Sequence, residues 1–177
     1  MSEGFVVWVT GLPGSGKTTI SKELEPKLRQ IGLSVEVLDG DEIRQNLSKG
    51  LGFSREDRET HLRRVTYVAK LLSRNGVGVI AAFISPYRNI RDYARKETTN
   101  FLEVYVKCSV ETCAKRDPKG LYKKASTGQI KDLTGPQDLY EEPLNPDLVV
   151  DTEALTVTEG ADLIMSRLKA KQLIPLT

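Results

Sequence analysis

The 177 residues suffice for one domain with a substantial hydrophobic core, and we expect a single domain over 1–177. Hydrophobic residues make up 39% of the chain and charged residues 28%, a balance typical of soluble globular proteins. The net charge of +2 gives no argument for a nucleic-acid partner, and no run approaches the roughly 20 apolar residues that predict a membrane span.

The first predicted element is a strand at Phe5–Val9, an apolar run that suits burial on both faces but is too short for a signal peptide. It leads into the pattern G-x-x-x-x-G-K-[ST], which predicts a P-loop. Backbone N–H groups of the loop would bind phosphate, Lys17 would reach the β- and γ-phosphates, and Thr18 would hold Mg²⁺. The residues expected to bind ATP here are Gly11, Leu12, Pro13, Gly14, Ser15, Gly16, Lys17, Thr18 and Thr19.

A helix is expected from Lys17 to about Ile31, because apolar residues such as Ile20 and Leu24 recur at helical spacing. The flanking strand and helix disfavour the alternative, a glycine-rich turn that precedes a helix by chance. Pro26 predicts a kink or a disturbed turn in this helix. The next strand, Ser34–Leu38, should pair in parallel with the first through a right-handed crossover.

Two acidic residues, Asp39 and Asp41, follow the second strand, where open parallel sheets bind their ligands. A carboxylate there can hold a metal-bound water or accept the proton of an acceptor hydroxyl. For Asp41 the N-cap of the following helix is an equally weighted alternative. Asp39 lies too far before that helix to cap it, so a function near Mg²⁺ is favoured.

The next long helix is expected to begin at Ser54, in a capping-box-like pattern with Asp57, and to end at Asn75. Its first turns mix arginines with acidic residues, which is usual for a solvated face. The only histidine, His61, lies in this helix. A lone histidine more often packs or lies at the surface than acts in catalysis.

A third buried strand, Val77–Ile84, ends without an acidic residue, so the carboxylate usual there in P-loop proteins is missing and Asp39 becomes the metal-side candidate. The following pattern predicts a helix over Asn89–Thr98, a strand over Phe101–Cys108 and a short helix over Val110–Arg116. The two cysteines have no metal-site or redox spacing, which favours reduced thiols in a cytoplasmic protein.

Residues 115–135 are basic, punctuated by glycine and poor in core residues. In a small P-loop protein this texture indicates a mobile lid that closes over phosphates; a solvated loop is the alternative. A strand at Leu148–Asp151 and a helix at Thr158–Lys171 complete the pattern. We therefore predict an α/β fold, with a five-stranded parallel sheet, helices on both faces and a basic lid.

Several P-loop classes share this pattern. A GTPase would carry a guanine-reading Asn-Lys-x-Asp stretch, which is absent, and a long ATPase would need more chain. A small kinase fits the length, the lid and the single P-loop, so the P-loop kinase fold is favoured.

Six motifs then occur in one order: the P-loop, Leu38-Asp39-Gly40-Asp41-x-x-Arg44, Leu51-Gly52-Phe53-Ser54 with Asp57-Arg58, Arg63-Arg64, the run Phe83 to Arg88, and the run Arg116 to Lys124. Their combination is highly specific. With these motifs the chain resembles the adenylyl-sulfate kinase family over nearly its whole length.

The resemblance implies transfer of the γ-phosphate of MgATP to the 3′-hydroxyl of adenosine 5′-phosphosulfate (APS), giving ADP and 3′-phosphoadenosine 5′-phosphosulfate (PAPS) in sulfate activation. Asp39 would be the base or orient the hydroxyl, Lys17 would offset γ-phosphate charge, and Arg116 would lie on the ATP adenine. A homodimer is expected, because the family is commonly dimeric. The residues that would bind APS are Asp41, Arg44, Phe53, Arg58, His61, Ile84, Ser85, Gly120 and Leu133.

Two positions depart from the family pattern: His61 stands where Asn is usual, and Leu133 where an aromatic residue is usual. His61 can still donate or accept one hydrogen bond, whereas Leu133 gives up stacking worth on the order of 0.5–1.5 kcal/mol. Both departures bear on APS affinity rather than on the type of reaction.

Two other functions stay open at this point. One is a small kinase for another nucleotide or metabolite hydroxyl, which the set Asp41, Arg44 and Arg58 disfavours because it suits an anionic nucleotide. The other is a nucleotide-binding module without transfer activity, which the intact Lys17 and Asp39 disfavour.

Overall fold

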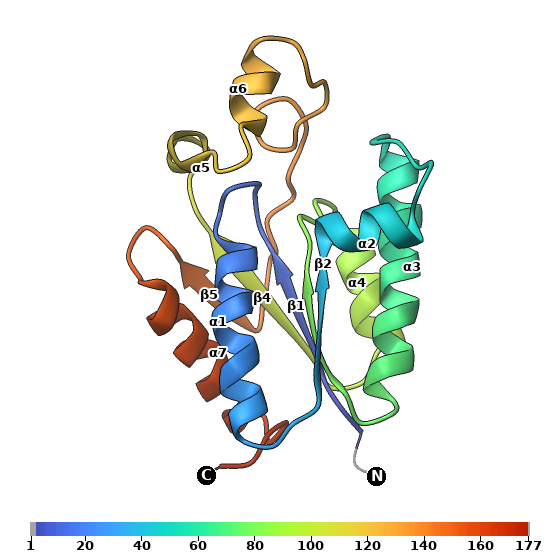
Figure 1. The fold of residues 1–177 in the computed structure, drawn as a ribbon, viewed down its shortest axis with the longest axis vertical. Coiled ribbons are helices and arrows are strands. Elements are labelled where there is room, and N and C mark those ends of the chain that lie inside the picture. The colour runs from blue at the N-terminus through green and yellow to red at the C-terminus, as the bar shows by residue number, and fades with distance from the viewer. Residues whose placement is uncertain (1–2, 177) are drawn as a thin grey trace.

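The computed structural model describes residues 3–176, in which helices cover both faces of one sheet (Figure 1). All neighbouring strands pair in parallel, in the order β2-β3-β1-β4-β5, which confirms the predicted sheet. The carboxyl ends of the strands therefore meet at one edge of the sheet. The strands are β1 (Val6–Thr10), β2 (Val35–Asp39), β3 (Gly78–Ala82), β4 (Phe101–Lys107) and β5 (Leu148–Asp151).

Each face of the sheet has its own apolar core because side chains alternate along the buried strands. Val7 and Val9 of β1 face helices α1 (Lys17–Gln30) and α7 (Val157–Ala170). Val6 and Trp8 face the opposite way, toward α3 (Arg55–Ser73) and α4 (Arg88–Glu97). β1 is buried along its whole length, so the loop that follows it starts from a fixed position.

Three shorter helices lie toward the carboxyl ends of the strands: α2 (Gly40–Leu47), α5 (Val110–Arg116) and α6 (Leu121–Ser126). In Figure 1, α5 and α6 stand beyond the sheet, above the loop between β1 and α1. β3 ends at Ala82, two residues before the predicted end, because the chain turns where Ser85 takes a φ of 40°.

The lid segment is more ordered in its packing than its composition predicts. We expected residues 115–135 to be poor in core residues; Tyr122, Ala125 and Leu133 are buried. They form a small apolar cluster together with Leu12 of the P-loop and the two free, buried cysteines. The lid thus has few core residues, as expected, and these few pack against Leu12, a contact that local composition does not show.

The first helix has nearly the predicted bounds. Pro26 lies inside α1, which continues from Lys17 to Gln30 without a break. At the other end of the chain, α7 begins with a capping box between Thr156 and Glu159.

Within residues 3–176, no helix is both long enough and apolar enough to cross a membrane.

Candidate active site

The P-loop joins β1 to α1 and depends on glycine at its tightest points. Gly11 has a φ of 157°, and a Cβ there would lie 2.5 Å from the carbonyl oxygen of Val106. Gly14 has a φ of 77°, and a Cβ there would lie 3.1 Å from the carbonyl oxygen of Cys113. Larger residues would therefore push the loop away from β4 and α5.

Lys17 is the buried cation of this loop. Its Nζ donates to the carbonyl oxygens of Gly11, at 2.9 Å, and Leu12, at 2.6 Å. Burial lowers the pKa of Lys17 to about 7, with Lys119 acting in the same direction and Asp39 in the opposite one. A phosphate placed beside Nζ would supply the counter-charge that this ammonium lacks.

Asp39 joins the P-loop helix to the end of β2. Its Oδ2 accepts a hydrogen bond from Thr18 Oγ1 at 3.2 Å, and its Oδ1 accepts from the backbone N–H of Asp41 at 3.0 Å. Asp39 is thus the N-cap of α2, and Asp41 lies in the first turn. Our expectation that Asp39 has no capping role was wrong, because α2 begins at Gly40, two residues earlier than a helix capped by Asp41 would.

One cavity of about 940 Å³ brings most of the predicted site residues together. Its lining includes Pro13, Gly14, Gly16, Lys17, Thr18, Thr19, Asp39, Asp41, Arg44, Phe53, Arg58, His61, Ile84, Ser85, Arg116 and Leu133. Gly11, Leu12, Ser15 and Gly120 are not part of the lining. The Cβ position of Gly120 meets no atom within 4 Å, whereas Leu12 and Ser15 are buried beneath the loop.

Arg44 and Phe53 form a stacked pair on the α2–α3 side of the cavity. The Cζ atom of Arg44 lies 4.3 Å from the centroid of the Phe53 ring, and Arg44 also donates to the carbonyl oxygen of Gly52. Phe53 is nevertheless 62% exposed. The Cζ atom of Arg58 also lies 5.9 Å from the centroid of this ring, so Phe53 lies next to two cations.

Arg58 is buried and its guanidinium contacts the lid. Nη1 donates to Thr134 Oγ1, Nη2 donates to the carbonyl oxygen of Asp132 at 2.6 Å, and Nε donates to that of Phe53 at 2.7 Å. Asp138 adds an ion pair at 3.7 Å. Arg58 therefore connects α3 to the second half of the lid, at Asp132 and Thr134. APS bound to Arg58 would contact the same side chain as the lid.

His61 is buried and electrically neutral at physiological pH. Its Nδ1 lies 2.7 Å from Ser48 Oγ, and its ring meets that of Phe83 edge-on, with centroids 5.6 Å apart. Burial, together with the charges of Arg44 and Arg64, lowers the pKa of His61 to about 4. The ring therefore offers a hydrogen-bonding nitrogen and no charge.

Thr152 is a site residue that the sequence reasoning missed. Arg116 donates to its hydroxyl at 2.9 Å and to its carbonyl oxygen at 2.7 Å, and the hydroxyl in turn donates to the carbonyl oxygen of Ser15 at 2.9 Å. With Leu155 to Val157, it lines the cavity, and its hydroxyl contacts the P-loop. A threonine after a short strand carries no motif, so no sequence signal marked it.

The lid contacts both sides of the cavity. Lys119, between α5 and α6, forms an ion pair with Asp41 of α2. The hydroxyl of Tyr122 donates to the carbonyl oxygen of Pro13 at 2.8 Å. Both residues belong to the motif Arg116 to Lys124, but the sequence did not show these contacts, because they join segments that are far apart in the chain.

A phosphate-binding loop, a buried lysine and a carboxylate beside the loop's threonine share one cavity with a set of arginines. This combination defines a P-loop phosphotransferase with an acceptor site for an anionic compound.

Comparisons with known proteins give the family. Residues 3–151 match the family model described as adenylylsulphate kinase. A chain described as "probable adenylyl-sulfate kinase" from Pseudomonas aeruginosa is 56% identical over 164 residues, which cover 93% of this chain and 77% of that one. The adenylyl-sulfate kinase of Rippkaea orientalis is 53% identical over 167 residues, 94% of this chain and 92% of the other. The chain belongs to the adenylylsulphate kinase family.

A solved structure agrees with this assignment. The Mycobacterium tuberculosis APS kinase, in complex with AMPPNP and APS, superposes with a TM-score of 0.92 at 40% identity, over 96% of this chain and 99% of that one. The protein is therefore an enzyme that phosphorylates APS with ATP to give PAPS. The predicted family, fold class and reaction are confirmed.

Proposed function

We propose that the cavity binds MgATP against the P-loop and Arg116, and APS among Arg44, Phe53, Arg58 and the end of β3. The observation that carries this proposal is the position of Asp39, which accepts from Thr18 on the P-loop side and lines the same cavity as Arg44 and Arg58. A carboxylate between donor and acceptor sites can act on the hydroxyl that receives the phosphate.

Mg²⁺ fits the residues beside Asp39. The hydroxyl of Thr18 and the carboxylate of Asp39 are hard oxygen ligands, which Mg²⁺ prefers. No group of three or more His, Cys, Asp or Glu residues that could hold a metal occurs within residues 3–176. Substrate phosphates and water would therefore have to supply the remaining ligands. Bound there, Mg²⁺ would offset charge on the β- and γ-phosphates.

The side chains of the chain itself then have separate tasks. Lys17, at the start of α1, would bind phosphate oxygens and stabilise the charge that moves toward ADP during transfer. Asp39, held by two hydrogen bonds, would accept the proton of the APS 3′-hydroxyl as that oxygen attacks the γ-phosphate in line. The lid, anchored to Arg58 and Asp41, would exclude water that could otherwise take the phosphate.

The acceptor site is tested by measuring ADP release from MgATP with APS, with AMP and without acceptor. We expect turnover with APS, a 3′-phosphorylated product, and little ADP in the other two reactions. Equal turnover with AMP would contradict the assignment of Arg44 and Arg58 to the phosphosulfate.

The remaining expectations are proposals of the same kind. We expect one domain over 1–177, and a homodimer, which light scattering during size-exclusion chromatography tests. The free thiols of Cys108 and Cys113 favour the cytoplasm as the compartment.

A further inference from the structure

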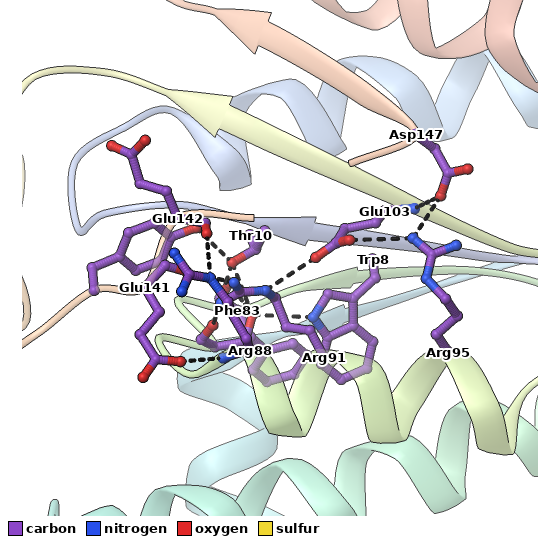
Figure 2. A network of polar contacts seen from close by, with 12 residues as sticks. Trp8, Thr10, Phe83, Arg88, Arg91, Arg95, Glu103, Glu141, Glu142 and Asp147 are labelled. Atoms are coloured by element: carbon purple, nitrogen blue, oxygen red, sulfur yellow. Dashed lines mark hydrogen bonds and ion pairs between the residues drawn. The ribbon is translucent and has the colours of Figure 1, made fainter. Parts of the chain in front are cut away.

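Arg91 is a buried cation outside the cavity lining, and the chemistry described above does not use it. It lies in α4 and is 2% exposed. Its guanidinium donates to three separate segments: Nη1 to the carbonyl oxygen of Ser85 at 2.6 Å, Nη2 to that of Glu141, and Nε to Glu103 Oε1 at 3.0 Å. Figure 2 shows Arg91 pointing toward Glu103. The planar guanidinium of arginine has five N–H donors and can therefore bond to several segments at once. The ammonium of lysine concentrates its donors on one nitrogen.

The first of these segments is the cavity wall at Ser85. Ser85 has a φ of 40°, a strained conformation for a residue with a side chain, which persists only where the surroundings hold it. Its hydroxyl accepts from Trp8 Nε1 at 3.0 Å, and its carbonyl oxygen accepts from Arg91. The conformation that places Ser85 on the cavity wall thus depends on both contacts.

The second segment, residues 140–142, is the return of the lid toward β5. The carbonyl oxygen of Glu141 accepts from Arg91, and its N–H donates to the carbonyl oxygen of Pro86 at 2.8 Å. The ring of Tyr140 lies 5.7 Å from the Cζ atom of Arg91, and its hydroxyl lies 2.9 Å from Thr10 Oγ1. Arg91 therefore joins the base of the lid to the wall of the cavity.

The third contact fixes Arg91 itself. Glu103 of β4 is 7% exposed and accepts from Arg91 with Oε1 and from Arg95 with Oε2. Arg95 also pairs with Asp147 at 2.8 Å, and Asp147 accepts from the N–H of Glu103 at the same distance. The carboxylate of Glu103 is held on the sheet, so Arg91 has one orientation.

We propose that Arg91, oriented by Glu103, is a positioning residue for the APS site: it fixes the backbone of Ser85 on the cavity wall and joins that wall to the base of the lid. The proposal rests on the placement of APS against Ser85 in the proposed function. Since Arg91 acts through two carbonyl groups on the acceptor side, its loss should weaken APS binding and leave ATP binding nearly unchanged.

Three variants test this proposal. Arg91→Met combined with Glu103→Leu removes the ion pair without leaving a buried charge alone, so the fold should persist. Arg91→Lys keeps a charge beside Glu103 but cannot reach all three acceptors. Arg95→Met is the matched control, because Arg95 contacts Glu103 and Asp147 but neither Ser85 nor Glu141.

Steady-state kinetics with each substrate varied, together with thermal unfolding of each variant, give the outcome. We expect the KM for APS to rise tenfold or more in the double variant and severalfold in Arg91→Lys, with the KM for ATP within twofold of wild type. Arg95→Met should leave both KM values within twofold. A KM for APS that matches the Arg95→Met control in both Arg91 variants, or an equal rise in both KM values, would overturn the proposal. Absence of APS-dependent ADP release in the wild type would instead overturn the function.

Discussion

Thr18 donates its hydroxyl hydrogen to Asp39 across 3.2 Å, and this bond joins the first turn of α1 to the end of β2. The other carboxylate oxygen of Asp39 caps α2. Both oxygens are therefore oriented by the fold before any substrate arrives. An oriented carboxylate beside a phosphate-binding loop is suited to proton transfer, because its geometry needs no rearrangement.

Asp39→Asn should lower kcat by about 10²–10⁴-fold, because the amide cannot take the proton of the acceptor hydroxyl. Asn caps helices about as well as Asp, so α2 should keep its position. We expect the KM for ATP to change less than about threefold. Steady-state kinetics check this, with Asp162→Asn on the exposed face of α7 as the control. An unchanged kcat would remove Asp39 from the proton transfer.

Arg58→Ala should raise the KM for APS more than tenfold and also loosen the lid. The arginine donates to Asp132 and Thr134, and a buried set of charge-assisted bonds is worth about 1.5–3 kcal/mol per bond. Limited trypsin digestion should therefore cleave the variant faster at Lys123 and Lys124. Thr134→Val, which removes one partner and keeps the cation, should show the faster cleavage in weaker form. An effect confined to the KM for ATP would contradict the placement of Arg58.

Binding of ATP should be accompanied by proton uptake at Lys17. The pKa of Lys17 is about 7 in the free protein, and bound phosphates raise it. At pH 8 most of the free protein has neutral Lys17, so about one proton should be taken up, and almost none at pH 6. Calorimetric titration with ATP in buffers of different ionisation enthalpy measures this number. Lys17→Met supplies the baseline, and equal uptake in wild type and variant would refute the assignment.

His61 should make the protein less stable in acid without appearing in its pH–rate profile. The folded protein holds His61 at a pKa of about 4, against 6.5 as the ordinary value, so the unfolded chain binds more protons between pH 4 and 6.5. The free energy of unfolding therefore falls as pH drops through this window, by about 3 kcal/mol at most for this group.

The matched variant for this effect is His61→Asn, which cannot titrate and can still bond Ser48. Its Tm should fall less than that of the wild type between pH 7 and pH 4.5. For kcat/KM, neither protein should show an inflection near pH 6.5 that arises from this position. A wild-type inflection that His61→Asn abolishes would show that the ring is charged in the working enzyme.

The sheet and the P-loop could be predicted because their signals are local. Each strand is a short apolar run, and the loop needs its glycines and Lys17 within eight consecutive positions. No such local signal showed whether Asp39 or Asp41 is the N-cap of α2. It depends on where α2 begins, and a start two residues earlier makes Asp39 rather than Asp41 the N-cap.

The contacts of the lid could not be predicted for a different reason. Arg58 meets Asp132 and Thr134 across 74 and 76 positions of sequence, and Tyr122 meets Pro13 across 109. Composition marked the segment as basic, and its lysines are indeed exposed. Its few apolar residues determine where it lies, because they pack on Leu12 and the cysteines.

Trp8 is the only tryptophan of the chain, and its indole N–H is bonded to Ser85 on the cavity wall. Its ring lies 6.0 Å from that of Phe83 and is fully buried. The enzyme thus carries a single tryptophan, and its indole is hydrogen-bonded to the cavity wall. The fluorescence emission of Trp8 therefore reports changes at the cavity wall when a ligand binds. No added label is needed, and no second tryptophan contributes to the signal.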